Sequence, residues 1–197
     1  MKVEPVTLEG EFVRLEPLRM EHHAALCDVA LDPELWRWTG ANVQTADDLR
    51  RYMEYALAEQ KEGHALPFAT FSKAAAKPVG STRFGNIDAR NRHVEIGWTW
   101  IGRQWQRTAL NSEAKLLMLR HAFDALGCLR VELKTDVQNQ QSRAAIARLG
   151  AKEEGVMRKH LITERGRVRD TVYYSIIDDE WPAVRARLEA RLRQVAQ

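Results

Sequence analysis

Residues 104–115 link an apolar run to an amphipathic segment, and they are Gln104-Trp105-Gln106-Arg107-Thr108-Ala109-Leu110-Asn111-Ser112-Glu113-Ala114-Lys115. The run, Val94 to Ile101, has the pattern of a strand, and the segment to about Leu126 has the period of a helix. A loop that enters a helix directs several free backbone N–H groups and the positive end of the helix dipole at one point. We therefore expect a strand, a phosphate-binding loop and a helix, in this order.

The bulk composition is that of a soluble globular protein. The 197 residues are enough for one domain with a substantial core, and we expect a single domain over 1–197. The chain is 45% hydrophobic and 29% charged, and its mean hydropathy is −0.45. It has no apolar run near the ~18–20 residues that cross a bilayer, and no signal-peptide pattern at Met1 to Pro5. Cys27 and Cys128 have no metal or redox spacing. These features predict a cytoplasmic protein that does not contact membranes.

The charge is only mildly basic. The formal net charge is +3 and the pI is near 9.0, so nucleic acid is not the expected partner. The densest group of cations, broken by Glu164 and Asp170, is Arg158, Lys159, Arg165, Arg167 and Arg169. Two interpretations stay open: a solvated hairpin face, or a surface that attracts a polyanionic ligand or an acidic substrate.

The first half of the chain predicts a strand, two helices and a meander. Phe12–Leu18 alternates as a strand, and Met20–Leu31 has the pattern of a short helix that ends before Pro33. Thr45 to Asp48 resembles a capping box, which predicts a second helix to about Glu62. The period then changes to two, and the expected antiparallel strands are Leu66–Ser72, Val79–Ile87 and Val94–Ile101.

The second half predicts a helix, a strand, a helix and a hairpin. The helix after the loop has Asn111 or Ser112 as its expected N-cap, and Gly127 ends it. Strand Arg130–Thr135 is parallel to its predecessor if a βαβ crossover joins them. The remaining elements are helix Asn139–Leu149, strands Val156–Ile162 and Arg169–Ile177, and helix Asp179–Val195. The expected fold is α+β, with a mixed, mostly antiparallel central sheet of about seven strands flanked by helices.

Several motifs in this order carry a family resemblance. They are Glu95-Ile96-Gly97-Trp98, Asn111-Ser112-Glu113-Ala114-Lys115, Arg130 to Asp136, Asn139-x-x-Ser142-x-x-Ala145-Ile146-x-x-Leu149-Gly150-Ala151, Glu154 to Arg158, and Asp170 to Ile176. Over about residues 8–190 the chain resembles the GNAT superfamily of N-acetyltransferases, in the RimJ/RimL-like branch that acetylates protein N-termini and related amines. The resemblance implies the GNAT acyl-CoA N-acyltransferase fold.

The resemblance implies acetyl-CoA as the acetyl donor. The spacing Gln-x-x-Arg-x-Ala is similar to the family's pyrophosphate loop, usually Gln/Arg-x-x-Gly-x-Gly/Ala. Arg107 stands where that pattern prefers glycine, and we expect it in an ordinary backbone conformation, with its charge available to a phosphate. The residues expected at the pyrophosphate are Gln104, Gln106, Arg107, Thr108, Ala109, Leu110 and Asn111, several of them through their backbone N–H groups. The alternative is a loop that merely joins a strand to a helix.

In the family, the strand before the loop separates from its neighbour, and the pantetheine arm enters the gap. Trp98, Thr99, Trp100 and Ile101 would line that gap, and one freed N–H could stabilise negative charge on the acetyl oxygen. Trp98 and Trp100 should share one face, and ordinary core packing is the alternative for both. Glu95 is a charge inside an apolar strand and is implied as the general base, because a carboxylate can assist loss of the α-amine proton near neutral pH. The alternative is an edge glutamate paired with Arg83 or Arg92.

Ser142 is implied near the coenzyme A sulfur, where it could return a proton to the leaving thiolate. Tyr173 and Tyr174 are its competitors for this role. Asn139 is implied as a pantetheine or phosphate contact. Both Asn139 and Ser142 have a plain alternative, since each could simply cap the first turn of a helix.

The acceptor pocket is expected between the first two helices and the neighbouring strands. Its candidate residues are Trp36 and Trp38 in the loop between those helices, and Arg83 and Asn86 on the strand before Glu95. The six histidines have no metal spacing, so we expect no metal site. No cysteine or serine is placed beside a histidine as a nucleophile, so direct attack without a covalent intermediate is expected.

These observations predict an acetyl-CoA-dependent N-acetyltransferase. Its acceptor is a small-molecule amine or the N-terminus of a protein or peptide, and the resemblance allows a homodimer. Two other hypotheses stay open. One is a coenzyme A-binding sensor or partner protein of the same fold without turnover, and the other is an RNA- or ribosome-binding domain.

Overall fold

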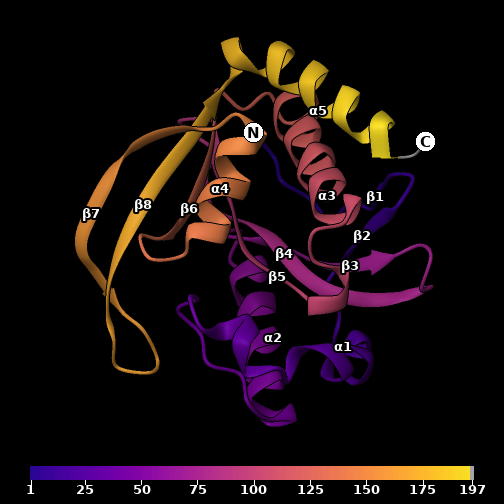
Figure 1. The fold of residues 1–197 in the computed structure, drawn as a ribbon, viewed down its shortest axis with the longest axis vertical. Coiled ribbons are helices and arrows are strands. Elements are labelled where there is room, and N and C mark those ends of the chain that lie inside the picture. The colour runs from indigo at the N-terminus through magenta and orange to yellow at the C-terminus, as the bar shows by residue number, and fades with distance from the viewer. Residues whose placement is uncertain (196–197) are drawn as a thin grey trace.

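The computed structural model describes residues 1–195 and shows a twisted central sheet with helices on both faces (Figure 1). The eight described strands follow the order β1-β2-β3-β4-β5-β6-β8-β7. All neighbours are antiparallel except β5 and β6. The strands are β1 Leu8–Glu9, β2 Val13–Pro17, β3 Leu66–Ser72, β4 Lys77–Asp88, β5 His93–Ile101, β6 Arg130–Asp136, β7 Lys152–Ile162 and β8 Val168–Ile177. The α+β class is confirmed, and the short edge strand β1 is the strand that the sequence did not predict.

The helices also follow the predicted order. They are α1 His23–Ala30, α2 Ala46–Lys61, α3 Ala109–Arg120, α4 Gln140–Leu149 and α5 Trp181–Val195. The predicted capping box begins α2: Thr45 Oγ1 accepts the N–H of Asp48 at 3.1 Å, and Asp48 Oδ2 accepts the N–H of Thr45 at 2.9 Å. Gly150 ends α4 with a φ of +100°, which glycine adopts without strain.

The start of α3 differs from the prediction. Its N-cap is Thr108, whose extended backbone and side chain (Oγ1 to the N–H of Leu110, 3.3 Å) begin the helix at Ala109. Asn111 and Ser112, the predicted caps, lie within the first turn. The helix also ends differently, because a π-helical turn, His121–Ala125, follows Arg120 before the chain turns at Gly127. The loop is therefore three or four residues shorter than expected, and its last residue, Thr108, caps the helix.

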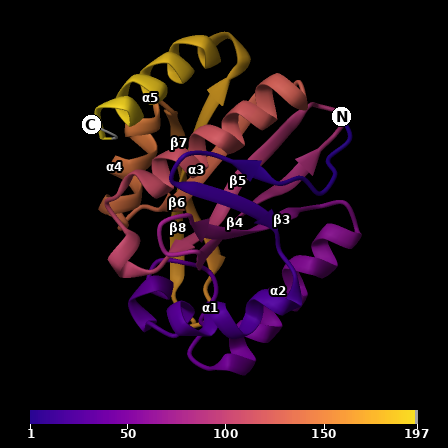
Figure 2. The ribbon, with the colours of Figure 1, turned by 90° about the vertical axis from the view of Figure 1, so that its right-hand side faces the viewer.

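The core is divided by the sheet. One cluster joins α3 and α5 to the sheet and includes Leu15, Phe84 and Met118. The other lies beneath α1 and α2 and includes Leu26, Trp36, Met53 and Trp100. Figure 2 shows α3 and α5 on one side of the sheet and α1 and α2 on the other.

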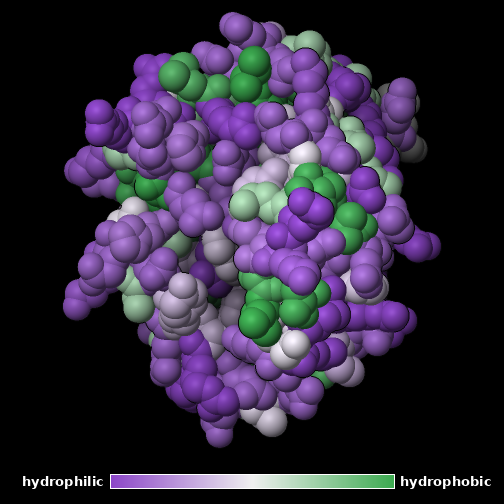
Figure 3. Space-filling view, turned by 90° about the vertical axis from the view of Figure 1, so that its left-hand side faces the viewer, coloured by the Kyte–Doolittle hydropathy of each residue, from purple (hydrophilic) through white to green (hydrophobic). Residues whose placement is uncertain are grey.

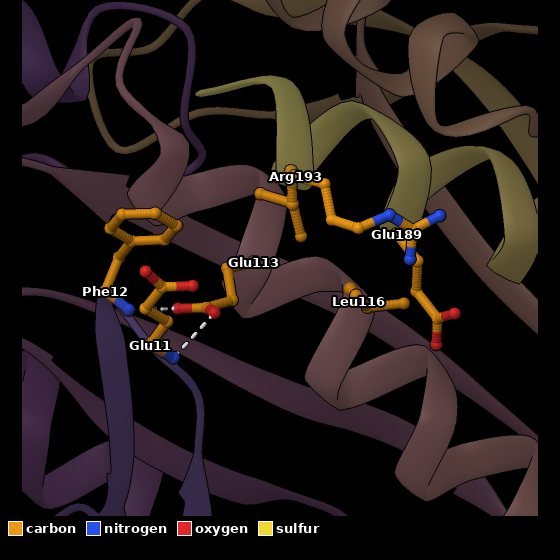
Figure 4. Close-up of a pocket in the computed structure, with 7 residues that line it drawn as sticks. Glu11, Phe12, Glu113, Leu116, Glu189 and Arg193 are labelled. Atoms are coloured by element: carbon orange, nitrogen blue, oxygen red, sulfur yellow. Dashed lines mark hydrogen bonds between the residues drawn. The ribbon is translucent and has the colours of Figure 1, made fainter. Parts of the chain in front are cut away.

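A buried carboxylate joins the edge hairpin, formed by β1 and β2, to α3. Both oxygens of Glu113 are used, since they accept the backbone N–H groups of Glu11, Phe12 and Val13 at 2.7, 2.7 and 2.8 Å. Figure 4 shows the bonds to Glu11 and Phe12. A Cβ on Gly10 would lie 2.3 Å from the carboxyl carbon of Glu113, so only glycine fits there. A carboxylate with three backbone donors needs no cation, and this part of the Asn111–Lys115 motif has a structural role.

Candidate functional site

The two parallel strands of the sheet separate after three residues. β5 pairs with β6 only from His93 to Glu95, although β5 continues to Ile101 and β6 to Asp136. On its other side β5 is bulged, because Arg83 and Ser81 of β4 face Gly97 and Trp100, and Trp98 has a φ of +49°. Beyond Glu95 on β5 and Glu132 on β6, the facing edges therefore have no partner among the described strands. An extended ligand could pair with these edges as an added strand.

A buried lysine supports the bulge from α3. Lys115 Nζ lies 2.6 Å from Thr99 Oγ1 and 3.0 Å from Thr82 Oγ1, and these two hydroxyls are 2.7 Å apart. Burial lowers the pKa of Lys115 from its ordinary 10.5 to about 7. On the opposite face, the hydroxyl of Tyr52 in α2 donates to the carbonyl of Trp98 at 3.4 Å. The bulge is thus held from both faces of the sheet.

The loop after β5 leads directly into α3. Arg107 has a φ of +61°, so the expectation of an ordinary backbone conformation is wrong. Between the 3₁₀ turn Arg103–Trp105 and α3 the chain changes direction, and a residue in the left-handed conformation makes this change. The family's glycine would adopt this conformation without strain. The Arg107 side chain is exposed and makes no hydrogen bond or ion pair with residues 1–195.

The other loop residues divide into bracing and exposed groups. Gln106 braces the loop: its Nε2 donates to the carbonyl of Ile101 at 3.0 Å, and its Oε1 accepts from Gln141 at 3.4 Å. Gln104 and Thr108 are exposed, whereas Ala109 and Leu110 are buried and offer only backbone groups. Asn111 is half-buried, and its Oδ1 has no partner among the described residues. The first-turn N–H groups of α3 remain the main anion donors here.

Glu95 lies at the point where the strands part, and its side chain is only 2% exposed. Its Oε2 accepts from Asn86 Nδ2 at 2.7 Å and pairs with Lys134 Nζ at 2.9 Å. The partner is therefore Lys134 of β6, and not Arg83 or Arg92. Oε1 accepts no hydrogen bond from the described residues. A Cβ on Gly97 would lie only 2.7 Å from Oε1. The absence of a side chain at Gly97 therefore leaves room for this oxygen.

The candidate proton donors lie on two faces. Asn139 Oδ1 accepts the N–H of Ser142 at 3.0 Å, which is the plain capping role that the sequence left open, and Ser142 is half-buried. Tyr174 is buried, and its hydroxyl is engaged by Arg143 and Glu153. Tyr173 instead pairs in register with Lys134, whose Nζ is 5.6 Å from its ring. Tyr173 therefore shares a face with Lys134 and Tyr174 does not.

A pocket of about 530 Å³ opens beside the bulge, a size suited to a small ligand. It is lined by Trp36, Thr39, Gly40, Ala41, Asn42, Val43, Asp48, Arg51, Tyr52, Tyr55, Arg83, Trp98, Trp100 and Glu164. Trp98 and Trp100 thus share one face, as predicted. Trp36 and Arg83 also reach the pocket, but Trp38 and Asn86 do not: Trp38 stacks with Arg37 and Arg167, and Asn86 bonds Glu95.

Tyr52, Tyr55 and Glu164 line the pocket without having been predicted from the sequence. The tyrosines lie beside the apolar stripe of α2, where Leu49, Met53 and Ala56 are buried, and spacing alone does not separate them from core residues. Glu164 arrives from the turn between β7 and β8. Its N–H donates to the carbonyl of Gly40 at 2.9 Å, and its Oε2 accepts the N–H of Asn42 at 2.7 Å. The turn therefore closes one side of the pocket.

The basic group of the β7–β8 hairpin is mostly satisfied within the chain. Arg167 and Arg169 both face the buried carboxylate of Asp136, and Arg165 Nε donates to Asn42 Oδ1 at 2.7 Å. Only Arg158 and Lys159 of the five are exposed without such partners in the described structure. Seen from the β7–β8 side, the surface is mostly hydrophilic and hollowed near its centre (Figure 3). This arrangement favours the solvated hairpin over a polyanion-binding face.

The described residues contain no group of three or more His, Cys, Asp or Glu side chains placed to hold a metal ion. Among the described helices, none has the length and apolar character needed to span a bilayer.

Comparisons with known proteins agree with this geometry. Residues 13–152 match the family model described as an acetyltransferase (GNAT) domain. A GCN5-related N-acetyltransferase from Brucella melitensis is 32% identical, with a TM-score of 0.90 over 98% of this chain and 87% of that one. RimJ from Mycobacterium smegmatis, solved in complex with CoA-disulfide, is 27% identical, with a TM-score of 0.81 over 95% of each chain.

A curated relative is YdaF from Bacillus subtilis, whose name assigns it provisionally to the ribosomal N-acetyltransferases. It is 35% identical over 102 residues, which cover 52% of this chain and 55% of YdaF. The match thus spans little more than half the length of that relative.

Proposed function

The chain belongs to the GNAT acetyltransferase family, and we propose that it transfers an acetyl group from acetyl-CoA to a primary amine by direct attack within a ternary complex. The observation that carries this proposal is the separation of β5 from β6 after Glu95, with the bulge at Trp98 and the N-terminus of α3 beside it. These features provide open backbone edges for an extended arm and N–H groups for phosphates. The relative solved with CoA-disulfide supports coenzyme A as the carrier.

We assign the cofactor contacts to three groups of residues. The N–H groups of Arg107, Thr108 and Ala109 and the free guanidinium of Arg107 hold the pyrophosphate, with Gln104 and Asn111 at its edge. The N–H of Gln106 donates to the carbonyl of Arg103, and that of Leu110 is shared with Thr108 Oγ1. The open edge of β5 from Trp98 to Ile101 pairs with the pantetheine arm, and Asn139 lies on the other side of the gap. Acetyl-CoA supplies an activated acyl group. Gln106 keeps the loop in shape through its bond to Ile101.

We assign the proton chemistry to Glu95. Its free oxygen, Oε1, accepts the amine proton directly or through one water, while Lys134 and Asn86 hold Oε2 in place. An N–H freed at the bulge donates to the acetyl oxygen as that atom gains negative charge. The leaving thiolate takes a proton from Ser142 or Tyr173. The hydroxyl of Tyr173 contacts His160 Nε2 at 3.3 Å. Tyr174 is the weaker candidate because it is not on the face of Lys134, and its hydroxyl is engaged by Arg143 and Glu153.

We propose an α-amine, and in particular a protein or peptide N-terminus, as the acceptor class. An α-amine has a pKa of about 7.7–8.0, against about 10.4 for lysine, so a carboxylate base removes its proton far more easily near neutral pH. YdaF, whose name places it provisionally among the ribosomal N-acetyltransferases, supports a protein acceptor, and we place the protein in the cytoplasm.

The test is release of free thiol from acetyl-CoA with a panel of peptides and small amines, each product being checked by mass. We expect one thiol released per acetylated amine, and saturable binding of coenzyme A by calorimetry. Binding of coenzyme A without thiol release from any amine would favour the sensor hypothesis. Absence of binding would contradict the cofactor assignment. Binding of RNA that weakens steeply with salt would instead support the nucleic-acid hypothesis.

A further inference from the structure

Arg83 is a buried cation without an anionic partner. It lies in the middle of β4 and is only 2% exposed. Its guanidinium carbon is 5.1 Å from the ring centre of Tyr52 and 4.9 Å from that of Trp98. Among residues 1–195 the guanidinium makes no ion pair and donates no hydrogen bond, and its buried Nε is without a partner.

The carboxylates around the pocket are engaged elsewhere. Of the two that line it, Asp48 is held by Arg51 and the cap of α2, and Glu164 by the N–H of Asn42. Glu95 lies outside the lining, and its Oε2 is held by Lys134 and Asn86. The indole N–H of Trp100, on the same pocket wall, also has no partner in the described structure. The pocket lining thus combines the unpaired charge of Arg83 with five aromatic rings, those of Trp36, Tyr52, Tyr55, Trp98 and Trp100.

Leaving this charge unpaired is expensive. A desolvated cation costs several kcal/mol unless it is compensated, and a cation–π contact returns only about 2 kcal/mol. A carboxylate that arrives with a ligand would supply the missing partner in a geometry that guanidinium favours. Natural sequences seldom keep an unpaired buried arginine without such a reason.

The register of β4 and β5 places this charge close to the proposed base. Arg83 faces Gly97, and Glu95 faces Gly85, so both side chains leave the same face of the sheet two residues apart, about 7 Å along the strand. Trp98 lies between them, since its ring contacts both Arg83 and Lys134, and a Cβ on Gly85 would lie 2.2 Å from that ring. An acceptor amine at Glu95 and a group at Arg83 therefore belong to one small molecule or to the first residues of one peptide.

We propose that the acceptor carries a carboxylate near its amine and that Arg83 binds this carboxylate. This inference rests on the proposed acetyl transfer and narrows its acceptor class. Two sources share the chemistry: an acidic side chain at the first or second position of a peptide, and the main-chain carboxylate of a free amino acid or dipeptide. The charge at Arg83 selects the acceptor and takes no part in the proton transfer.

The test compares matched acceptors in the thiol-release assay. One arm uses peptides that begin with Asp or Glu, or carry them second, against the same peptides with Asn or Gln. The other arm uses free amino acids and dipeptides against their C-terminal amides. For the wild-type protein we expect kcat/KM to be at least about 30-fold higher for the carboxylate member of one arm. This is the effect expected when a buried charge gains or loses its charged partner. The arm that shows the difference identifies the source.

Variants then assign the preference to Arg83. R83M should remove the preference by raising KM for the carboxylate acceptor, while kcat/KM for the neutral acceptor and KM for acetyl-CoA change less than about threefold. R83K should keep part of the preference, because it retains charge but loses the planar fork. R90M removes an exposed arginine from the same hairpin and the same unit of net charge, and it should behave like the wild type.

The outcomes separate the two proposals. If no amine releases thiol, the acetyl transfer itself is wrong. If the wild-type protein acetylates amines but does not distinguish carboxylate from amide, or if R83M keeps the full preference, the role of Arg83 is wrong while the acetyl transfer stands. If R83M does not fold, the wild-type comparison still tests the preference for a carboxylate, and R83K tests the role of Arg83.

Discussion

Glu113 and Arg83 are both almost wholly buried beside a pocket, yet the chain compensates only the first of these charges. Glu113 receives three backbone N–H groups from the edge hairpin, so both of its oxygens are used. Arg83 has only two aromatic rings, and none of its nitrogens donates to a described residue. The first arrangement joins two elements of the fold, and the second leaves an interaction for a ligand. Burial alone does not distinguish them, whereas the complete set of partners does.

Glu95 is intermediate between these two cases. One oxygen is held by Lys134 and Asn86, and the other is free. If the free oxygen accepts the amine proton, E95Q should lower kcat by about 10²–10³-fold, since a general base contributes roughly this much. KM for acetyl-CoA should stay within about threefold. Steady-state kinetics by thiol release measure both.

A matched control uses the register partner of Glu95. E132Q makes the same chemical change on β6, at a residue that pairs with Arg130. It should leave kcat near the wild-type value. Equal activity of E95Q and the wild type would remove Glu95 from the proton transfer and leave it as a partner of Lys134.

Replacement of Glu113, the fully compensated charge, should lower the stability of the protein. E113Q replaces an acceptor of three N–H groups with an amide that can satisfy only part of them. We expect the free energy of unfolding to fall by about 3 kcal/mol, because bonds to a charged acceptor are worth ~1.5–3 kcal/mol and the unsatisfied donors are costly. Acceptor preference should not change. Urea denaturation at pH 7 measures the stability.

E11Q is the control for this change. Glu11 is adjacent in space, is exposed and contributes its backbone N–H, so its side chain should matter little. If E113Q were no less stable than E11Q, the hairpin would not depend on the buried carboxylate. The statement that Glu113 has a structural role, in contrast to Arg83, would then be wrong.

The local parts of this arrangement could be predicted from the sequence, and the partners of buried charges could not. The cap at Thr45 and the helix stop at Gly150 follow from short patterns, and the resemblance implied that the strand before the loop separates from its neighbour, although not at which residue. The partner of Glu95, Lys134, lies on β6, which follows β5 only after a crossover helix. The spacing of residues in the sequence therefore does not predict this pair. Arg83 meets Tyr52 of α2 and Trp98 of β5 only once the sheet and helix pack.

The loop also shows where a pattern misleads. Asn111 and Ser112 are good caps by residue type, but Thr108 takes the cap because its extended backbone precedes the first turn. Arg107 is left-handed because the turn into α3 requires this conformation, whatever residue occupies the position. At the N-cap of α3 and at Arg107, the path of the backbone determines the conformation, and the usual preferences of the residue types do not.

Lys115 extends the comparison to a buried amine. It lies two residues from Glu113 on α3, and its partners are the hydroxyls of Thr82 and Thr99. Burial lowers its pKa to about 7 in the folded protein, against 10.5 when unfolded. Between these values the unfolded chain holds the proton and the folded protein does not. Stability should therefore rise with pH in this range, by about 1.4 kcal/mol per unit, and be lost again as pH falls toward 7.

The measurement is the free energy of unfolding in urea at pH 7 and pH 9. The wild-type protein should gain about 2.3 kcal/mol over this interval, because the folded lysine is half-protonated at pH 7, and K115M should lack the gain. The interval stops at pH 9 because burial raises the pKa of Cys27 and Cys128, and that of Cys128 to about 11. Above pH 9 these thiols would lower stability as pH rises. An equal gain in K115M would show that the lysine is not the group that titrates.

Arg107 tests the comparison where the charge is exposed and the backbone is strained. R107G and R107A remove the same charge, but only glycine relieves the left-handed conformation. R107A should be less stable than R107G by about 1 kcal/mol in urea, since the strain remains. Both should weaken binding of coenzyme A by about threefold, the usual value of an exposed charge contact, and less at high salt. If R107G bound more tightly than the wild type, backbone freedom would matter more to the phosphate loop than the arginine charge, and the family's glycine would be the better residue for binding.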